Sequence, residues 1–183
     1  MLVQQYVDQL SYALDHIPVD SIQKAIFEID KVIHNGNSVF TCGNGGSALT
    51  ASHFVTDWSK MCWTNKGRPF RAYCLSDNIG MLTAYSNDIS YDDVFAESLK
   101  NYAKPGDMLI VVSGSGNSEN IIRALHAAKK LALSTIGLSG FNGGKVNQLA
   151  DISVHYPVDD MQIVEDLHLS FGHMVMKSLC SCA

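Results

Sequence analysis

Five short apolar runs, each followed by a stretch with helical spacing, are the feature that most constrains this fold. The runs cover residues 38–42, 70–75, 108–113, 134–138 and 152–156. Strands that are buried on both faces have such continuous apolar sequences, and parallel strands need a long connection between them. The pattern therefore predicts an α/β fold, a three-layer sandwich with a five-stranded parallel sheet, helices on both faces and right-handed crossovers.

Helical spacing of apolar residues also precedes and separates these runs. The first 33 residues predict two helices, with Pro18 between them. Later helices are expected over residues 47–60, 79–86, 91–103, 118–131, 144–150 and about 162–180. Ser47 and Ser118 occupy positions where N-caps are expected. No linker, composition shift or repeat interrupts the chain, so residues 1–183 are expected to form a single domain.

The composition excludes several classes of protein. With 13 basic against 18 acidic side chains, the net charge is −5, which is unsuited to a nucleic-acid backbone. No apolar stretch approaches the roughly 20 residues of a membrane span, and the amino terminus lacks the pattern of a signal peptide. A cytoplasmic protein with no membrane partner is expected. Its five cysteines form no CxxC pair, so disulfides are judged improbable.

A glycine-rich segment, Gly43-Asn44-Gly45-Gly46-Ser47, follows the first predicted strand and leads into a helix. Glycines allow a tight turn and close approach to a ligand, and the amides at a helix start favour an anion. The spacing matches neither a dinucleotide fingerprint nor a P-loop. Taken alone, the segment is equally consistent with a plain strand-to-helix turn.

A second such segment, Ser113-Gly114-Ser115-Gly116-Asn117-Ser118, follows the third predicted strand. Three hydroxyls and a helix start can surround a phosphate with neutral donors, without a lysine. Ligands of open parallel sheets bind beyond the carboxyl ends of the strands. Phosphate binding is therefore favoured here over a merely solvated turn.

Four ionisable residues on two predicted helices form a candidate metal site. His53 and Asp57 are four residues apart on one helix face, while Glu165 and His173 lie on a strongly apolar closing helix. Two imidazoles and two carboxylates suit zinc or another divalent transition metal. However, eight helical residues separate Glu165 from His173 by about 12 Å. Either Glu165 precedes the regular helix, or the two residues contribute from different subunits.

These motifs together resemble the sugar isomerase (SIS) domain family, and within it the phosphoheptose isomerase branch. The resemblance is carried by residues 42–48, 51–54, 83–84, 87–88 and 113–118, and by Asn120, His168 and His173. It implies a flavodoxin-like SIS fold and a homotetramer with active sites between subunits, in which the helices of residues 1–35 pack the oligomer. It also implies conversion of sedoheptulose 7-phosphate to D-glycero-D-manno-heptose 7-phosphate through an enediol, in heptose biosynthesis for lipopolysaccharide or capsule.

The resemblance further implies a role for each site residue. The residues expected to hold the sugar phosphate are Ser113, Gly114, Ser115 and Ser118. Those expected to contact the rest of the substrate are Asn44, Gly45, Gly46, Ser47, Asp88 and Glu165. Asp57 and His173 would exchange protons with the substrate. One zinc ion per subunit would be bound by His53, Asp57, Glu165 and His173.

Three positions depart from the family pattern. Asp57 stands where relatives have Glu, Glu165 replaces a Gln, and Gln162 replaces an Asp. These changes affect the expected substrate more than the expected reaction class. Two alternatives remain open at this point: an isomerase acting on another sugar phosphate, and a non-catalytic SIS protein that binds a phosphosugar or a protein partner.

Overall fold

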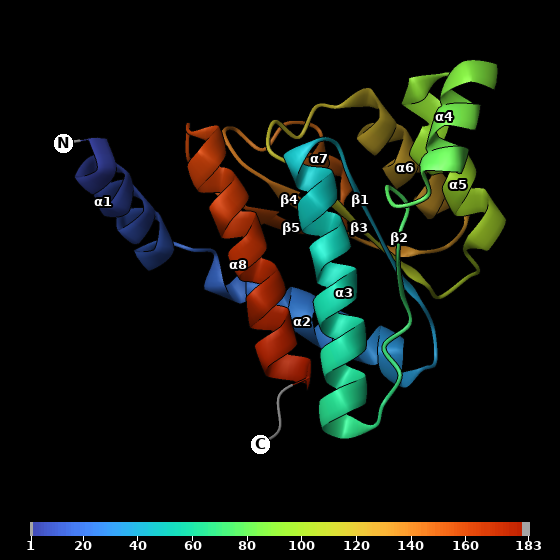
Figure 1. Cartoon of the computed structure of the whole chain (residues 1–183), viewed down its shortest axis with the longest axis horizontal. Helices are drawn as coiled ribbons and strands as arrows, with labels where there is room; N and C mark the ends of the chain where they lie inside the picture. Colours follow the sequence, from blue (N-terminus) through green and yellow to red (C-terminus); the bar gives the residue numbers. More distant parts are fainter. Residues whose placement is uncertain (1, 181–183) are drawn as a thin grey trace.

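The computed structural model describes residues 2–180 and confirms the five-stranded parallel sheet (Figure 1). The strands are β1 (Val39–Gly43), β2 (Ala72–Cys74), β3 (Met108–Ser113), β4 (Ser134–Ser139) and β5 (Ile152–His155). Their order in the sheet is β2-β1-β3-β4-β5, with every neighbouring pair parallel. In register, Val39 lies opposite Ala72 on one side and Met108 on the other. This is the strand order of flavodoxin-like folds, and the family resemblance implied a fold of this kind.

The strand order reverses between β1 and β3, which are neighbours in the sheet but not in the chain. Connections on either side of such a switch point run to opposite faces, and a crevice opens beyond the carboxyl ends of the two strands. The segments that follow β1 and β3 are the two glycine-rich loops singled out in the sequence. The fold thus places both candidate anion-binding loops at one location.

Eight α-helices and one short 3-10 helix are found within residues 2–180. They are α1 (Leu2–Asp15), α2 (Val19–His34), α3 (Gly46–Lys66), α4 (Ile79–Asp88), η1 (Tyr91–Asp93), α5 (Val94–Tyr102), α6 (Glu119–Lys130), α7 (Val146–Leu149) and α8 (Met161–Cys180). The expected helix over 47–60 is thus six residues longer at its carboxyl end. It ends at Gly67, which takes the left-handed conformation common after a helix.

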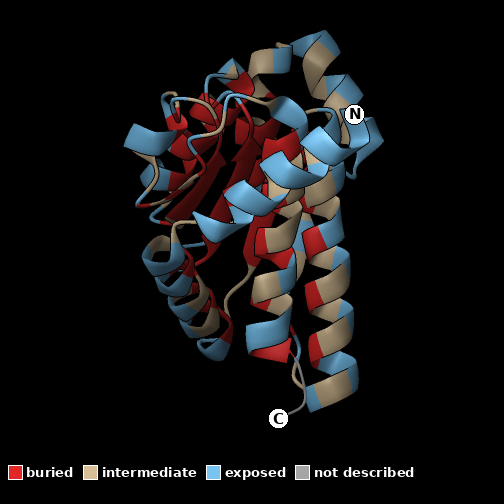
Figure 2. Ribbon diagram, turned by 90° about the vertical axis from the view of Figure 1, so that its left-hand side faces the viewer, coloured by how far each residue is buried: buried red, intermediate tan, exposed pale blue. Residues whose placement is uncertain are grey.

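Two hydrophobic cores, one on each face of the sheet, hold the layers together. Along β3, Met108, Ile110 and Val112 pack with α2, α3 and α8, whereas Leu109 and Val111 pack with α5 and α6. Figure 2 shows the buried residues concentrated in the strands and on the inward faces of the helices. This alternation explains why β3 has a continuous apolar sequence, since both of its faces are covered.

The amino-terminal helix α1 is poorly covered by the rest of the chain. Leu2, Val3 and Tyr12 are exposed, and only Ala13 of this helix is buried. Tyr6 anchors α1 to α8 by donating a hydrogen bond to Asp166 Oδ2, and this bond raises the pKa of Tyr6 to about 12. That residues 1–35 pack against other subunits remains a prediction. None of the described helices is long and apolar enough to cross a membrane.

The expectation of no disulfide is wrong for one pair of cysteines. Cys62 near the end of α3 and Cys180 at the end of α8 form a disulfide, although they are 118 residues apart in sequence. The packing of α3 beside α8 creates this proximity, which Cys spacing cannot reveal. Cys42 and Cys74 are free, as expected, and burial raises the pKa of both thiols. Cys182 lies outside the described residues.

Candidate functional site

The loop after β1 turns tightly into α3. Gly45 has a φ of +53° and occupies the N-cap position, so the expectation of a Ser47 N-cap is wrong. Ser47 is instead a buried residue in the first turn of α3. A side chain at Gly43 would collide with the Ser47 backbone, which explains why this turn requires glycine.

The loop after β3 has three differently exposed serines. Ser113 is buried at the end of the strand, Ser115 is exposed, and Ser118 is half-buried as the N-cap residue of α6. The N-cap position of Ser118 is confirmed, although within residues 2–180 its hydroxyl makes no capping hydrogen bond. Its hydroxyl and the first amides of α6 are thus available to a ligand.

The two loops are joined by side chains across the switch point. Asn44 and Asn120 form a reciprocal amide pair, with Nδ2-to-Oδ1 distances of 2.9 and 3.0 Å. Asn44 Oδ1 also accepts a hydrogen bond from Tyr91 Oη at 2.7 Å. The Asn44 side chain, expected to contact substrate, is therefore already engaged by the protein on most of its polar atoms.

A third loop, residues 140–145 after β4, lies against the second loop and was not singled out from the sequence. The Gly140 amide donates to Gly114 O at 2.8 Å, and the Lys145 amide donates to Asn117 Oδ1 at 3.2 Å. Gly116, with a φ of +65°, lies so close to the backbone of Gly143 that any side chain would collide. The sequence signal was present, because glycines also follow the fourth predicted strand. This loop braces the serine-rich one.

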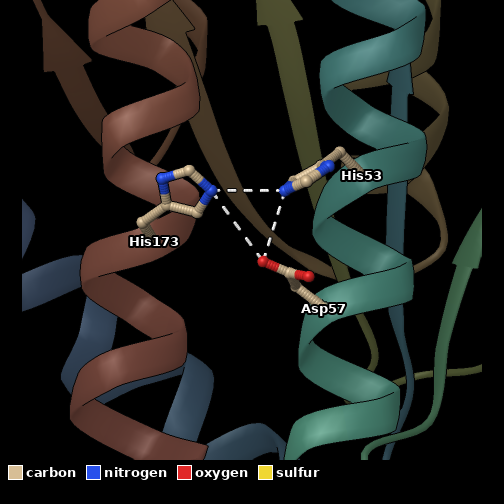
Figure 3. A group of neighbouring side chains, drawn as sticks. All are labelled: His53, Asp57 and His173. Carbon is tan, nitrogen blue, oxygen red and sulfur yellow. Dashed lines mark hydrogen bonds and ion pairs between the residues drawn. The ribbon is translucent and has the colours of Figure 1, made fainter.

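The second half of the site lies on the surface between α3 and α8 (Figure 3). His53 and Asp57 project from α3 toward His173 on α8. Asp57 Oδ2 lies 3.2 Å from His53 Nε2 and 3.9 Å from His173 Nε2, and the two Nε2 atoms are 3.2 Å apart. The two imidazoles remain 43% and 47% exposed, so a ligand or a neighbouring subunit can reach them. We call this group the seam triad.

Glu165 does not belong to the seam triad. It lies within α8, so the first of the two alternatives, in which Glu165 precedes the regular helix, is wrong. Its carboxylate is packed beside Gly46, with Oε1 2.5 Å from the position that a Cβ atom there would take. Because α8 is regular from Met161 onward, Glu165 and His173 stay two turns apart. Within one chain, Glu165 therefore faces the first loop and not the metal-type group. A contribution from another subunit remains a prediction.

Asp88, the other expected substrate contact, is the last residue of α4. It is exposed, and its Oδ1 accepts a hydrogen bond from Asn87 Nδ2. Among the described residues, no hydrogen bond or ion pair connects it to either loop or to the seam triad. Since α4 buries none of its residues, Asp88 belongs to the least anchored part of the site.

The chemistry of the seam triad suits a divalent transition metal. One ligand atom from each of His53, Asp57 and His173 lies within 4.8 Å of the other two. Two imidazole nitrogens and one carboxylate oxygen form a donor set typical of catalytic zinc, which keeps a further position for water or substrate. Three of the four predicted ligands are therefore brought together, and Glu165 is not.

His168 shows how strongly α8 is buried on its inner side. This histidine is fully buried, and neither ring nitrogen has a hydrogen-bond partner within residues 2–180 by distance and angle. Burial lowers the pKa of His168 to about 4, and the nearby backbone of Ser139 opposes this only in part. His168 is therefore neutral near pH 7. It lies on the same helix as Glu165 and His173 and helps to seat that helix on the sheet.

Comparison with known proteins agrees with this geometry. Residues 5–140 match the model of the SIS domain. The chain is 37% identical over 163 residues to the phosphoheptose isomerase of Aliarcobacter butzleri, covering 87% of this chain and 86% of the relative. It is 34% identical to the probable phosphoheptose isomerase of Thermoplasma volcanium, over 99% and 92% of the two chains.

Solved structures give the same result. The phosphoheptose isomerase of Francisella tularensis superposes with a TM-score of 0.90 at 26% identity, covering 97% of this chain and 96% of that one. The phosphoheptose isomerase of Neisseria gonorrhoeae superposes with a TM-score of 0.87 at 26% identity, over 98% of both chains. The similarity thus extends over the amino-terminal helices and α8 as well as the sheet.

Proposed function

The chain belongs to the SIS domain family and is an isomerase of its phosphoheptose isomerase group, and we propose that it converts sedoheptulose 7-phosphate to D-glycero-D-manno-heptose 7-phosphate. One observation carries this proposal: the serine-rich loop at the sheet edge and the seam triad lie at different levels along α3 and α8. Gly114 of the serine-rich loop packs against Met161 and Val164 at the start of α8, and nine positions of that helix, about 13 Å, separate Val164 from His173. A long sugar with phosphate on its last carbon and its reacting carbons at the other end fits such a separation.

The phosphate end of the substrate is assigned to the loop after β3. Hydroxyls of Ser113, Ser115 and Ser118, with the amide of Gly114, offer neutral donors in front of the twelve-residue helix α6. Because these donors contact the phosphate far from the reacting carbons, they stabilise ground state and transition state alike. Their contribution is to binding and orientation.

The sugar chain is assigned to the surface between the loops and the seam triad. The residues proposed to contact it are Asn44, Gly45, Gly46, Ser47, Asp88 and Glu165. Glu165 lies beside Gly46 and can accept hydrogen bonds from sugar hydroxyls. Since the family resemblance implies Gln at this position, this carboxylate is the clearest candidate for a difference in substrate preference.

Asp57 and His173 are the proposed acid/base pair. Aldose–ketose isomerisation moves a proton between C1 and C2 through an enediol, and it also moves a proton between the two oxygens. One of the pair removes the proton from carbon while the other exchanges a proton with the oxygens, and Nε2 of His53 lies 3.2 Å from both Asp57 Oδ2 and His173 Nε2. Oδ2 of Asp57 is within 4 Å of both imidazole Nε2 atoms, so the carboxylate also orients the rings and stabilises a protonated imidazole.

We also propose one zinc ion per subunit at His53, Asp57 and His173, with Glu165 of another subunit as the fourth ligand. Bound there, zinc would act as a Lewis acid toward the substrate oxygens. A ligand lone pair cannot hold a metal and accept a proton at the same time, so Asp57 or His173 could act as a base only through an atom that does not hold the metal. Elemental analysis of protein purified without chelator or affinity metal should give near-stoichiometric zinc, and finding none would leave the acid/base proposal alone.

A homotetramer with active sites between subunits is proposed for the assembly. Its support is the exposure of the seam triad and of large apolar side chains nearby, including Leu49 and Trp63 on α3, which are 74% and 61% exposed. Apolar surface of this kind is normally covered in an oligomer. A cytoplasmic location is proposed from the phosphorylated substrate. The Cys62–Cys180 disulfide argues against a cytoplasmic location, because reducing compartments disfavour such bonds.

A panel of sugar phosphates tests the proposed function. The purified protein is incubated with pentose, hexose and heptose phosphates, and NMR follows aldose against ketose. We expect turnover of sedoheptulose 7-phosphate at least tenfold faster than of shorter sugars. Faster turnover of a shorter sugar would assign a different substrate to the same chemistry. Binding without turnover of any sugar would contradict the enzyme and favour a sensor.

A further inference from the structure

We propose that Asn120 and Tyr91 are positioning residues that hold Asn44, and with it the loop after β1, at a fixed spacing from the phosphate-binding loop after β3. This inference rests on the proposed function, because it assumes that phosphate binds between these loops. Neither residue is among those assigned to substrate above. Both act through Asn44 and not by touching the reacting carbons.

The geometry of the amide pair carries the argument. Asn44 lies in the loop after β1, and Asn120 lies in the first turn of α6, which follows the other loop. Each amide donates to the other, at 2.9 and 3.0 Å, and Asn120 is only 2% exposed. A doubly bonded amide pair with one buried member fixes both separation and orientation, since moving either loop breaks two hydrogen bonds together.

The backbone does not provide this link. The parallel ladder between β1 and β3 reaches only as far as the pair of Gly43 and Val112. Beyond that point, no backbone hydrogen bond between residues 44–46 and 114–117 occurs within the described part of the chain. The backbone ladder stops where the strands end, and beyond that point the Asn44–Asn120 side-chain pair links the two loops. It sets the width of the opening in which a phosphate would bind.

Tyr91 completes the arrangement from a different segment. Its hydroxyl donates to Asn44 Oδ1 at 2.7 Å, so both lone pairs of that oxygen are used. One N–H of Asn44 is bonded to Asn120, which leaves a single N–H for a ligand. The direction of that remaining donor is fixed by the three bonds. Asn44 thus offers substrate one oriented donor, and its orientation depends on Asn120 and Tyr91.

Asn120→Leu is the main test, because leucine has a similar volume and removes both hydrogen bonds. We expect the KM for sedoheptulose 7-phosphate to rise about tenfold with kcat changed less than threefold, since a misplaced phosphate site weakens ground state and transition state equally. Calorimetric titration with inorganic phosphate should show the same tenfold loss of affinity. Tyr91→Phe, which removes one hydroxyl, should raise KM about threefold and weaken phosphate affinity about threefold.

A double variant separates positioning from a general structural effect. If Asn120 acts through Asn44, then Asn120→Leu should change phosphate affinity by less than twofold when Asn44 is already leucine. Thr135→Val is the stability control, because buried Thr135 exchanges hydrogen bonds with Asp151 far from both loops. Tyr85→Phe is the control for Tyr91→Phe, since its hydroxyl is bonded to Asn101. Neither control should move phosphate affinity.

Two results would overturn the proposal. The first is phosphate affinity within twofold of the parent in both Asn120→Leu and Tyr91→Phe. The second is the same loss from Asn120→Leu whether residue 44 is Asn or Leu. If Asn120→Leu does not fold, Tyr91→Phe in the two residue-44 backgrounds decides the question alone. Since phosphate binding needs no turnover, a protein that failed the sugar panel would still confirm or reject this positioning.

Discussion

The two halves of the candidate site are built in different ways. The loops after β1 and β3 are held by a buried strand ladder, by close approaches at Gly43 and Gly116 and by the Asn44–Asn120 pair. The seam triad consists of two exposed imidazoles and a half-buried carboxylate on α3 and α8, between which no backbone hydrogen bond occurs in the described part of the chain (Figure 3). Binding geometry is therefore part of the fold, whereas proton transfer depends on side chains that the fold can lose without unfolding.

The largest expected effect separates activity from stability at the seam triad. His173→Ala and Asp57→Ala should each lower kcat about a thousandfold, the range expected for removal of a general acid or base. Both side chains are partly exposed, so the free energy of unfolding should change by less than about 1 kcal/mol. Turnover assays and urea titration measure the two effects, with exposed His126→Ala as the control. A kcat within fivefold of the parent would contradict the assignment.

A substitution in the loops should have the opposite effect, because it should lower the stability of the fold. Gly116→Ala places a Cβ at positive φ and against the Gly143 backbone, and we expect a loss of roughly 3 kcal/mol of stability. Gly67→Ala is the matched control, because Gly67 has a similar φ of +62° with open space around it. The control should cost only about 1 kcal/mol. Equal losses in urea titration would show that positive φ alone, and not the contact between loops, requires glycine at 116.

A third prediction concerns the buried side of α8, which connects the two halves. His168 has a folded pKa of about 4 against 6.5 in the unfolded chain, so the unfolded state binds more protons between these values. Its neutral burial therefore stabilises the fold above pH 6.5, and about 3 kcal/mol of that stability is lost as the pH falls to 4.

His168→Leu isolates this contribution. The difference in unfolding free energy between parent and variant, measured by urea titration from pH 7 to pH 4, should change by about 3 kcal/mol in favour of the variant. Carboxylates that titrate in the same range cancel in this difference. A difference that does not vary with pH would mean that His168 is not buried in its neutral form.

The smallest expected effect is on substrate binding. Ser115→Ala removes one exposed hydroxyl from the phosphate-binding loop, and the KM should rise about fivefold while kcat stays within twofold. Ser170→Ala, on the outer part of α8 where the hydroxyl bonds to Asp166 O, is the control. Unchanged KM in Ser115→Ala would place the phosphate elsewhere. Together with the His173 prediction, it means that changes in the loops should affect KM and changes in the seam triad should affect kcat.

Sequence was sufficient for the parts of this molecule that depend on local pattern. β3 was predicted at its observed bounds because both of its faces are buried, while β2 is shorter than expected because it is an edge strand with a half-exposed Tyr73. Helix spacing also brought His53 and Asp57 together correctly. Each of these inferences needs only residues close in the chain.

Some errors were local, such as the N-cap of α3 and its carboxyl end, but the larger ones involve side chains that meet across long stretches of sequence. The Asn44–Asn120 pair, the Cys62–Cys180 disulfide and the packing of Glu165 beside Gly46 join residues more than 70 positions apart. Such contacts depend on how α3, α6 and α8 are seated on the sheet, which no periodicity specifies. The expected grouping of His173 with His53 rested on their chemistry as metal ligands, and the packing of α3 beside α8 confirms it.

A crystal structure with bound sedoheptulose 7-phosphate tests the central claim most directly. The account predicts the phosphate within hydrogen-bond distance of the serines at 115 and 118, and C1 and C2 within about 4 Å of Asp57 and His173, from one subunit or from two. A ligand whose phosphate lies away from residues 113–118, or whose reacting carbons lie away from both Asp57 and His173, would contradict the account.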